Sequence, residues 1–135
     1  MSTAGAKPQN ITFTKYPIKN AAALVKGVGV IFDGATDVDV ATANTEVVGV
    51  AQETLTGDGT KQCEVALLAG GGTLRVKASG VCTKGKYAVA GIDGFENQTA
   101  GGGTTVVHIC GVFLETGVDG DFVEMIPMRM PAVKV

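Results

Sequence analysis

Residues 48–54 read Val-Gly-Val-Ala-Gln-Glu-Thr, and residues 110–116 read Cys-Gly-Val-Phe-Leu-Glu-Thr. Each stretch runs into a turn of glycine and aspartate and then into a second apolar run. Upstream, Lys26-Gly27 and Lys84-Gly85 each open a hydrophobic stretch that ends in Asp-Gly. The later copies lie about 60 positions after the earlier ones, and such a shared order and spacing indicates a repeated structural unit. The sequence therefore predicts a degenerate internal duplication, with halves at about residues 24–70 and 82–128.

The composition favours strands over helices. The chain has 135 residues, of which 45% are hydrophobic, with 20 glycines and no tryptophan. Valine and threonine, which are abundant, favour strands, and frequent glycine favours tight turns. Residues 21–25 are expected to form one helical turn, but no longer window keeps an apolar helical stripe free of glycine. The sequence thus predicts an all-β domain, a compact β-barrel or β-roll-like fold built from the duplication.

About nine short strands are expected from alternating apolar and polar residues bounded by turn residues. They are residues 11–16, 28–32, 38–40, 45–55, 61–68, 74–79, 86–92, 105–115 and 121–127. The start of the chain is small and polar and has no periodicity. Residues 1–19 are therefore predicted to form an extended N-terminal arm, and residues 20–135 the β domain.

Charge and cysteine usage restrict the class of partner. A net charge of −2 gives no positive field for nucleic acid or an anionic membrane, and no apolar run has the length of a membrane span. Cys63, Cys82 and Cys110 are odd in number and widely spaced, which is typical of a reducing compartment of synthesis. We expect neither nucleic acid nor membrane as a partner.

Residues 80–86 match the spelling G-x-x-x-x-G-K of a phosphate-binding loop. That loop needs a Ser or Thr hydroxyl after its lysine, and a helix whose first N–H groups face the phosphates. Here Tyr87 follows Lys86, and glycines interrupt the residues beyond it. The segment is interpreted as a β-turn with solvated lysines, so no nucleotide cofactor is expected.

The remaining polar residues are interpreted as structural. The three cysteines and His108 have the right number of donors for zinc, but no close pair of cysteines forms the usual knuckle. We expect buried thiols and no metal, and the acidic turns lack the spacing of a calcium loop. Glu53 and Glu115 are equivalent in the two halves. A carboxylate pair can be catalytic, but each is expected to stabilise a turn or face solvent.

Residues 25–27, 48–51, 74–81 and 83–87 together resemble a family of tailed-phage capsid decoration (cement) proteins. The pattern is Val-Lys-Gly, then Val-Gly-Val-Ala, then Leu-Arg-Val-Lys-Ala-Ser-Gly-Val, then Thr-Lys-Gly-Lys-Tyr, and the likeness spans about residues 20–128. The resemblance implies a compact β domain, a homotrimer, and a place outside the head where it staples capsid subunits. The chain departs from the family at Lys86, where an acidic residue is common, and in its longer arm.

The predicted function is that of a structural virion protein and not of an enzyme. We expect it to be made in the host cytoplasm, to bind the major capsid protein on the outer surface of an icosahedral phage head, and to stabilise the shell without a cofactor. A mean hydropathy of +0.28 is high for a soluble monomer and suggests apolar interfaces between subunits. The alternatives are a tail or fibre module and a small-molecule-binding β-barrel.

The expected contact with the capsid lies in the arm. Ile11, Phe13, Tyr16 and Ile18 belong to an alternating segment with no obvious hairpin mate in its own chain. Such a strand tends to pair with another chain by edge addition, with aromatic side chains as anchors. These four residues are the predicted partner contact, and no catalytic or metal-ligating residue is predicted.

Overall fold

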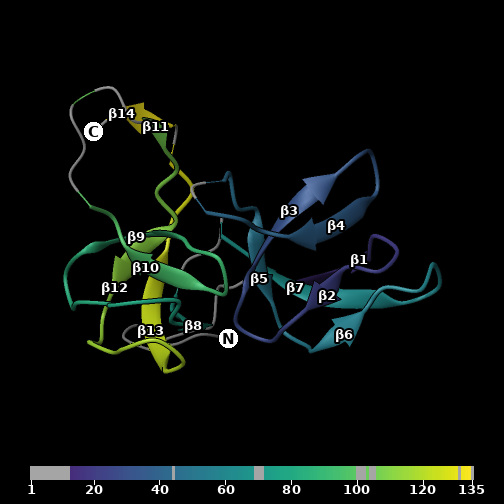
Figure 1. The fold of residues 1–135 in the computed structure, drawn as a ribbon, viewed down its shortest axis with the longest axis horizontal. Coiled ribbons are helices and arrows are strands. Elements are labelled where there is room, and N and C mark those ends of the chain that lie inside the picture. The colour runs from purple at the N-terminus through teal and green to yellow at the C-terminus, as the bar shows by residue number, and fades with distance from the viewer. Residues whose placement is uncertain are drawn as a thin grey trace, which may run out of the picture.

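The computed structural model describes residues 13–43, 45–68, 72–99, 103, 106–130 and 132–134. Within these ranges the chain forms fourteen strands and no helix, which confirms the all-β prediction (Figure 1). Ten of the strands make two five-stranded antiparallel sheets, and the other four make two small two-stranded sheets. Among the described residues no helix is long and apolar enough to cross a membrane.

The two large sheets come from successive parts of the chain. The first has the order β1 (Phe13–Pro17), β7 (Gln62–Leu67), β5 (Gly49–Ala51), β3 (Gly29–Asp33), β4 (Asp37–Val40). The second has the order β8 (Leu74–Lys77), β13 (Phe122–Pro127), β12 (Gly111–Phe113), β9 (Tyr87–Ala90), β10 (Phe95–Asn97). The small sheets pair β2 (Ala23–Leu24) with β6 (Leu55–Thr56), and β11 (Val106–Val107) with β14 (Val133–Lys134). Below, residues 13–68 are the first half and residues 74–127 the second half.

Strand register shows that the second half repeats the topology of the first. The pair Ala51–Val65 corresponds to Phe113–Met125. The edge strand β1 pairs with β7 as β8 pairs with β13, and the β2–β6 pair has its counterpart in one bridge between Cys82 and Gly117. The duplication therefore includes β1 and β8, which lie outside the halves that the sequence predicted.

Each large sheet curls until its two outer strands meet. In the first half they meet at the parallel bridge between Ile18 and Val38, and in the second at the bridge between Ala78 and Phe95. One residue pair is not a continuous ladder, so neither sheet is a closed barrel. The bridges protect only one end of the outer strands, at Ile18 and at Ala78, from pairing with another chain.

Two local predictions were wrong. Residues 13–19 do not stand apart as an arm, because β1 is hydrogen-bonded along its length to β7 and Ile18 to the edge of β4. Strand β1 has no pairing partner next to it in sequence, and it pairs instead with β7, a distant segment of the same chain. The helical turn expected at residues 21–25 is instead the short strand β2, since packing and ladder bonds outweigh the weak helical preference of three alanines. Residues 1–12 lie outside the described residues.

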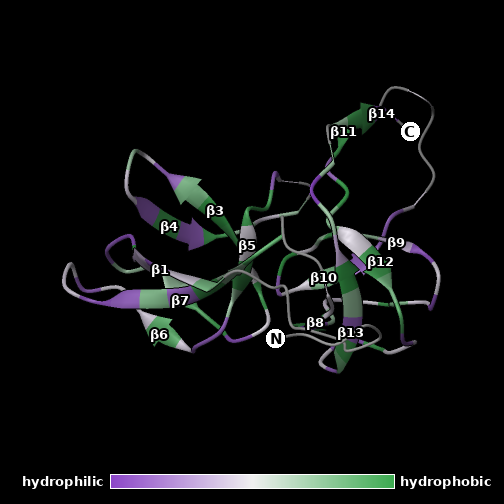
Figure 2. Cartoon of the chain, turned by 180° about the vertical axis from the view of Figure 1, so that it is seen from behind, coloured by the Kyte–Doolittle hydropathy of each residue, from purple (hydrophilic) through white to green (hydrophobic). Residues whose placement is uncertain are grey.

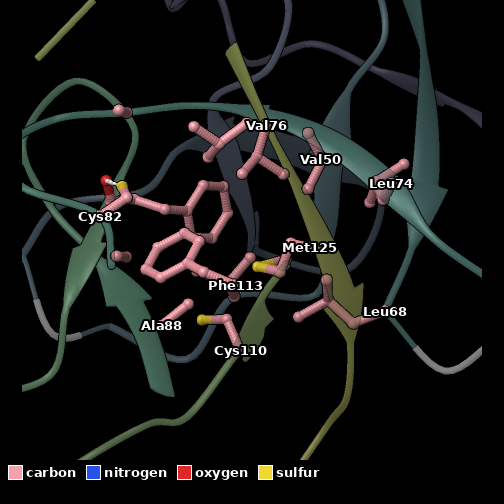
Figure 3. Packing of buried hydrophobic residues seen from close by; sticks show 14 of the residues in the cluster. Val50, Leu68, Leu74, Val76, Cys82, Ala88, Cys110, Phe113 and Met125 are labelled. Atoms are coloured by element: carbon pink, nitrogen blue, oxygen red, sulfur yellow. Dashed lines mark hydrogen bonds between the residues drawn. The ribbon is translucent and has the colours of Figure 1, made fainter. Parts of the chain in front are cut away.

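Alternation along the strands gives each sheet an inner and an outer face. The inner face of the first sheet forms its own core. The inner face of the second sheet forms the larger core, around Phe95, Phe113 and Met125 (Figure 3). Val50 and Ala66, on the outer face of the first sheet, also belong to that second core. The two halves are thus joined by one apolar cluster.

Candidate functional site

The segment at residues 80–86 is a turn, as the sequence predicted. The Lys86 N–H donates to the Thr83 carbonyl at 3.0 Å, and Gly85 has a φ of 87°, a value that favours glycine. The first half has the same turn, with the Val28 N–H on the Val25 carbonyl at 3.1 Å. Strand β9 follows directly, so the segment does not present a helix N-terminus to a phosphate.

The three thiols are buried in two separate cores, and His108 is half-buried outside them. Cys63 is buried in the first half, and Cys82 and Cys110 are buried in the second. Burial raises the pKa of Cys82 to about 11 and that of Cys110 to about 12, so both are neutral thiols near pH 7 and poor nucleophiles. Among the described residues, no three His, Cys, Asp or Glu side chains lie close enough to share a metal ion.

The equivalent carboxylates Glu53 and Glu115 have the structural role that the sequence predicted. Glu53 Oε2 accepts the Glu64 N–H at 2.9 Å, and Glu115 Oε1 accepts the Glu124 N–H at 2.9 Å. Each therefore ties the loop before a long strand to that strand. In the second half Glu115 also pairs with Arg75 at 3.1 Å. Each carboxylate is thus engaged with the backbone of its own half.

The structure places the predicted contact residues in different environments, from buried to exposed. Ile18 is 3% exposed in the core of the first half, where an external partner does not reach it. The Tyr16 ring is half-buried and packs edge-on against Phe32, with 5.4 Å between ring centroids. Phe13 is 50% exposed on β1, and Ile11 lies outside the described residues. Of the described predicted contacts, Phe13 is the most accessible.

A surface that the sequence did not indicate lies on the outer face of the second sheet. Tyr87, Val112 and Ile126 pair directly across β9, β12 and β13, so their side chains form one row. Tyr87 and Ile126 are exposed, and Val112 is half-buried. Figure 2 shows that hydrophobic residues predominate in β12 and β13, whereas hydrophilic and hydrophobic residues alternate in β4 of the first half. Contiguous exposed apolar side chains of this kind are typical of interaction surfaces.

A groove of about 550 Å³ opens at the junction of the two halves. Its lining residues are Lys26, Gly27, Ala51, Gln52, Arg75 and Phe122. Gly27 permits the halves to approach here, because a Cβ atom on it would lie 2.7 Å from the Phe122 ring and 2.9 Å from the Lys77 nitrogen. The Lys77 N–H in turn donates to the Gly27 carbonyl at 2.9 Å.

The groove is positively charged. Lys26 and Arg75 line it, and Lys77 lies on β8 opposite Phe122, with which it shares the outer face. Arg75 is neutralised in part by Glu115. Among the residues that the structure describes, neither Lys26 nor Lys77 has a carboxylate within ion-pairing distance. The groove therefore fits an acidic side chain from a partner.

No family model and no curated protein matches this chain. The fold, by contrast, is similar to the crystal structure of the N base of head fiber gp8.5 in bacteriophage phi29. The TM-score is 0.65 at 18% sequence identity, and the match covers 92% of this chain and 98% of that chain. At this identity the similarity shows a shared fold.

Proposed function

We propose that this chain is a structural virion protein that sits on the outer surface of a phage head. The observation that carries the proposal is the near-complete overlap of its fold with the base of a phage head fiber. The cement pattern in the sequence supports the same location. The site geometry agrees with a binding role, because the conspicuous carboxylates and thiols are engaged in holding the fold.

The proposed partners are the major capsid protein and two further copies of the chain, in a homotrimer. We propose Phe13 as the contact residue, and its exposed side chain on the edge strand of the first sheet supports that role. A capsid segment that reaches this edge would gain main-chain hydrogen bonds and an aromatic anchor.

Binding to the head is tested by co-sedimentation of the purified chain with undecorated, expanded capsids. Deletion should stop at residue 12, because β1 begins at Phe13 and its loss would disturb the first sheet. We expect Phe13→Ala to weaken binding by about 1–3 kcal/mol. Val118→Ala, which removes a 61% exposed side chain from a loop, is the matched control. Absence of any co-sedimentation by the intact chain would refute a place on the head.

The same capsids separate a cement protein from the base of a fibre, the second function that the fold favours. A cement protein stabilises the shell, so decorated capsids should melt at a higher temperature than bare ones. A fibre base should bind at few places per head and leave the melting temperature unchanged. Differential scanning calorimetry together with counting of bound chains distinguishes the two.

A further inference from the structure

We propose that copies of this chain assemble by seating the β3–β4 hairpin of one copy in the cationic groove of the next. This inference deepens the proposed homotrimer by naming its interface. It rests on the opposite charges of the hairpin and the groove and on the repulsion between carboxylates within the hairpin. It also rests on the separation of the hairpin from the groove within one molecule.

The hairpin is acidic on one face. Asp33 pairs with Asp37 across β3 and β4, and Asp39 follows two residues further on the same face. Carboxylates directly opposite each other on adjacent strands repel and destabilise the pairing. Lys19 is shared between Asp33 at 3.8 Å and Asp39 at 3.5 Å, and it is the counter-ion that the described residues supply. A cation from another molecule would relieve the remaining repulsion.

The groove offers that cation. Lys26 lines it and Lys77 lies beside it, both free of carboxylate partners within the described part of the chain. Beside its basic residues, the groove also exposes 44% of the Phe122 side chain. The two surfaces therefore carry charges of opposite sign, the pattern expected of complementary sides of an interface.

A single copy cannot make this contact with itself. The β3–β4 hairpin extends from the far end of the first half, whereas β8 and β13, which carry the groove, lie across the molecule from it in both views (Figures 1 and 2). The contact must therefore join two copies head to tail. Such heterologous contacts close into rings when the rotation between copies permits, and a ring of three satisfies the proposed trimer.

Charge reversal tests the pairing, with assembly measured by analytical ultracentrifugation. Lys26→Glu and Asp37→Lys should each raise the dissociation constant of the assembly by about tenfold or more, because attraction becomes repulsion. The double variant should recover most of the affinity. An equimolar mixture of the single variants should associate more tightly than either variant alone, because each presents a matching surface to the other. It should form pairs or open chains and not the closed ring, since a ring of three leaves one mismatched contact.

The duplication provides a matched control. Lys84 occupies the position equivalent to Lys26, and the N–H of each donates to a threonine hydroxyl at 3.1 Å. Lys84→Glu and Asp119→Lys change the net charge equally but lie off both surfaces, so assembly should be unaffected. Wild-type protein that stays monomeric, or a double variant that assembles no better than the single ones, would overturn the inference. Capsid co-sedimentation of Lys26→Glu separates the two proposals, since a monomer that still binds heads leaves the virion role intact.

Discussion

One row of side chains has opposite surroundings in the two halves. In the first half the row is Gly29, Val50 and Ala66, and it is buried beneath the second half. In the second half the equivalent row is Tyr87, Val112 and Ile126, and it faces outward. Small residues thus stand where the halves pack together, and large ones where the face is open. The repeated fold places the row at the same position in both halves. The size of its side chains depends on whether the other half packs against it.

The largest expected effect comes from exchanging core residues between the halves. Phe113 is fully buried in the second half, and its equivalent in the first half is Ala51. We expect Phe113→Ala to reduce the free energy of unfolding by about 3–5 kcal/mol, because the surrounding side chains cannot fill the cavity that the ring leaves. Urea denaturation measures the loss. Val112→Ala, on the opposite face of the same strand, should cost much less, and equal losses would contradict this view of the core.

The next experiment replaces a residue of the buried row in the first half by its equivalent from the outward-facing row in the second half. A Cβ atom on Gly29 would already lie 3.2 Å from the Phe95 ring and from Val47. Gly29→Tyr should therefore push the halves apart and cost about 3 kcal/mol. Tyr87→Gly, the reverse exchange, removes an exposed side chain and should cost only about 1 kcal/mol. Thermal unfolding of both variants checks the asymmetry, which would vanish if the halves did not pack through this row.

The two structural carboxylates should differ by a smaller amount. Each accepts one backbone N–H, but Glu115 alone has an ion pair, with Arg75. Replacing either by glutamine weakens a charge-assisted hydrogen bond, which corresponds to about 1 kcal/mol. Glu115→Gln should cost slightly more than Glu53→Gln at low salt, and the two should converge as salt screens the exposed pair. Chemical denaturation at two salt concentrations provides the measurement.

The smallest effect concerns the acid side of the stability profile. Hydrogen bonds from the Thr60 hydroxyl and backbone lower the pKa of Asp58 below its usual 3.8. A lowered folded-state pKa means that this group stabilises the fold above its unfolded pKa. The contribution is lost as the pH falls through the folded value. Asp58→Asn should therefore flatten the decline in stability below about pH 4. An unchanged slope in urea titrations across that range would rule out the contribution.

The sequence revealed the duplication at the positions where the two halves share the same turn residues. The glycines after Lys26 and Lys84, and the shared Glu-Thr step, locate the same turns in both halves. It did not reveal that β1 is the counterpart of β8, because Thr14-Lys15-Tyr16 and the equivalent Leu74-Arg75-Val76 share one basic residue and little else. Pairing with a distant strand is a tertiary contact, which a local pattern does not contain. For that reason the strand was interpreted as an arm.

The groove and the outward-facing row of the second half could not be predicted from local sequence for the same reason. Lys26, Arg75 and Phe122 are far apart in sequence and meet only because the halves pack together. The exchange of Ala66 for Ile126 between equivalent positions was visible in the repeat. Its meaning, however, depends on knowing which face is covered, and this required the structure.

The pairing of β1 with β7 also bears on how the chain is made. On the ribosome, residues 13–17 emerge well before β7, so they must wait for most of the first half before their hydrogen bonds can form. The first half can then complete itself while the second is still being synthesised. Val50 and Ala66 would remain uncovered during that interval and would serve as the surface on which the second half folds. We expect protease protection of β1 in nascent chains stalled before β13 emerges, and its absence would show that the halves fold only together.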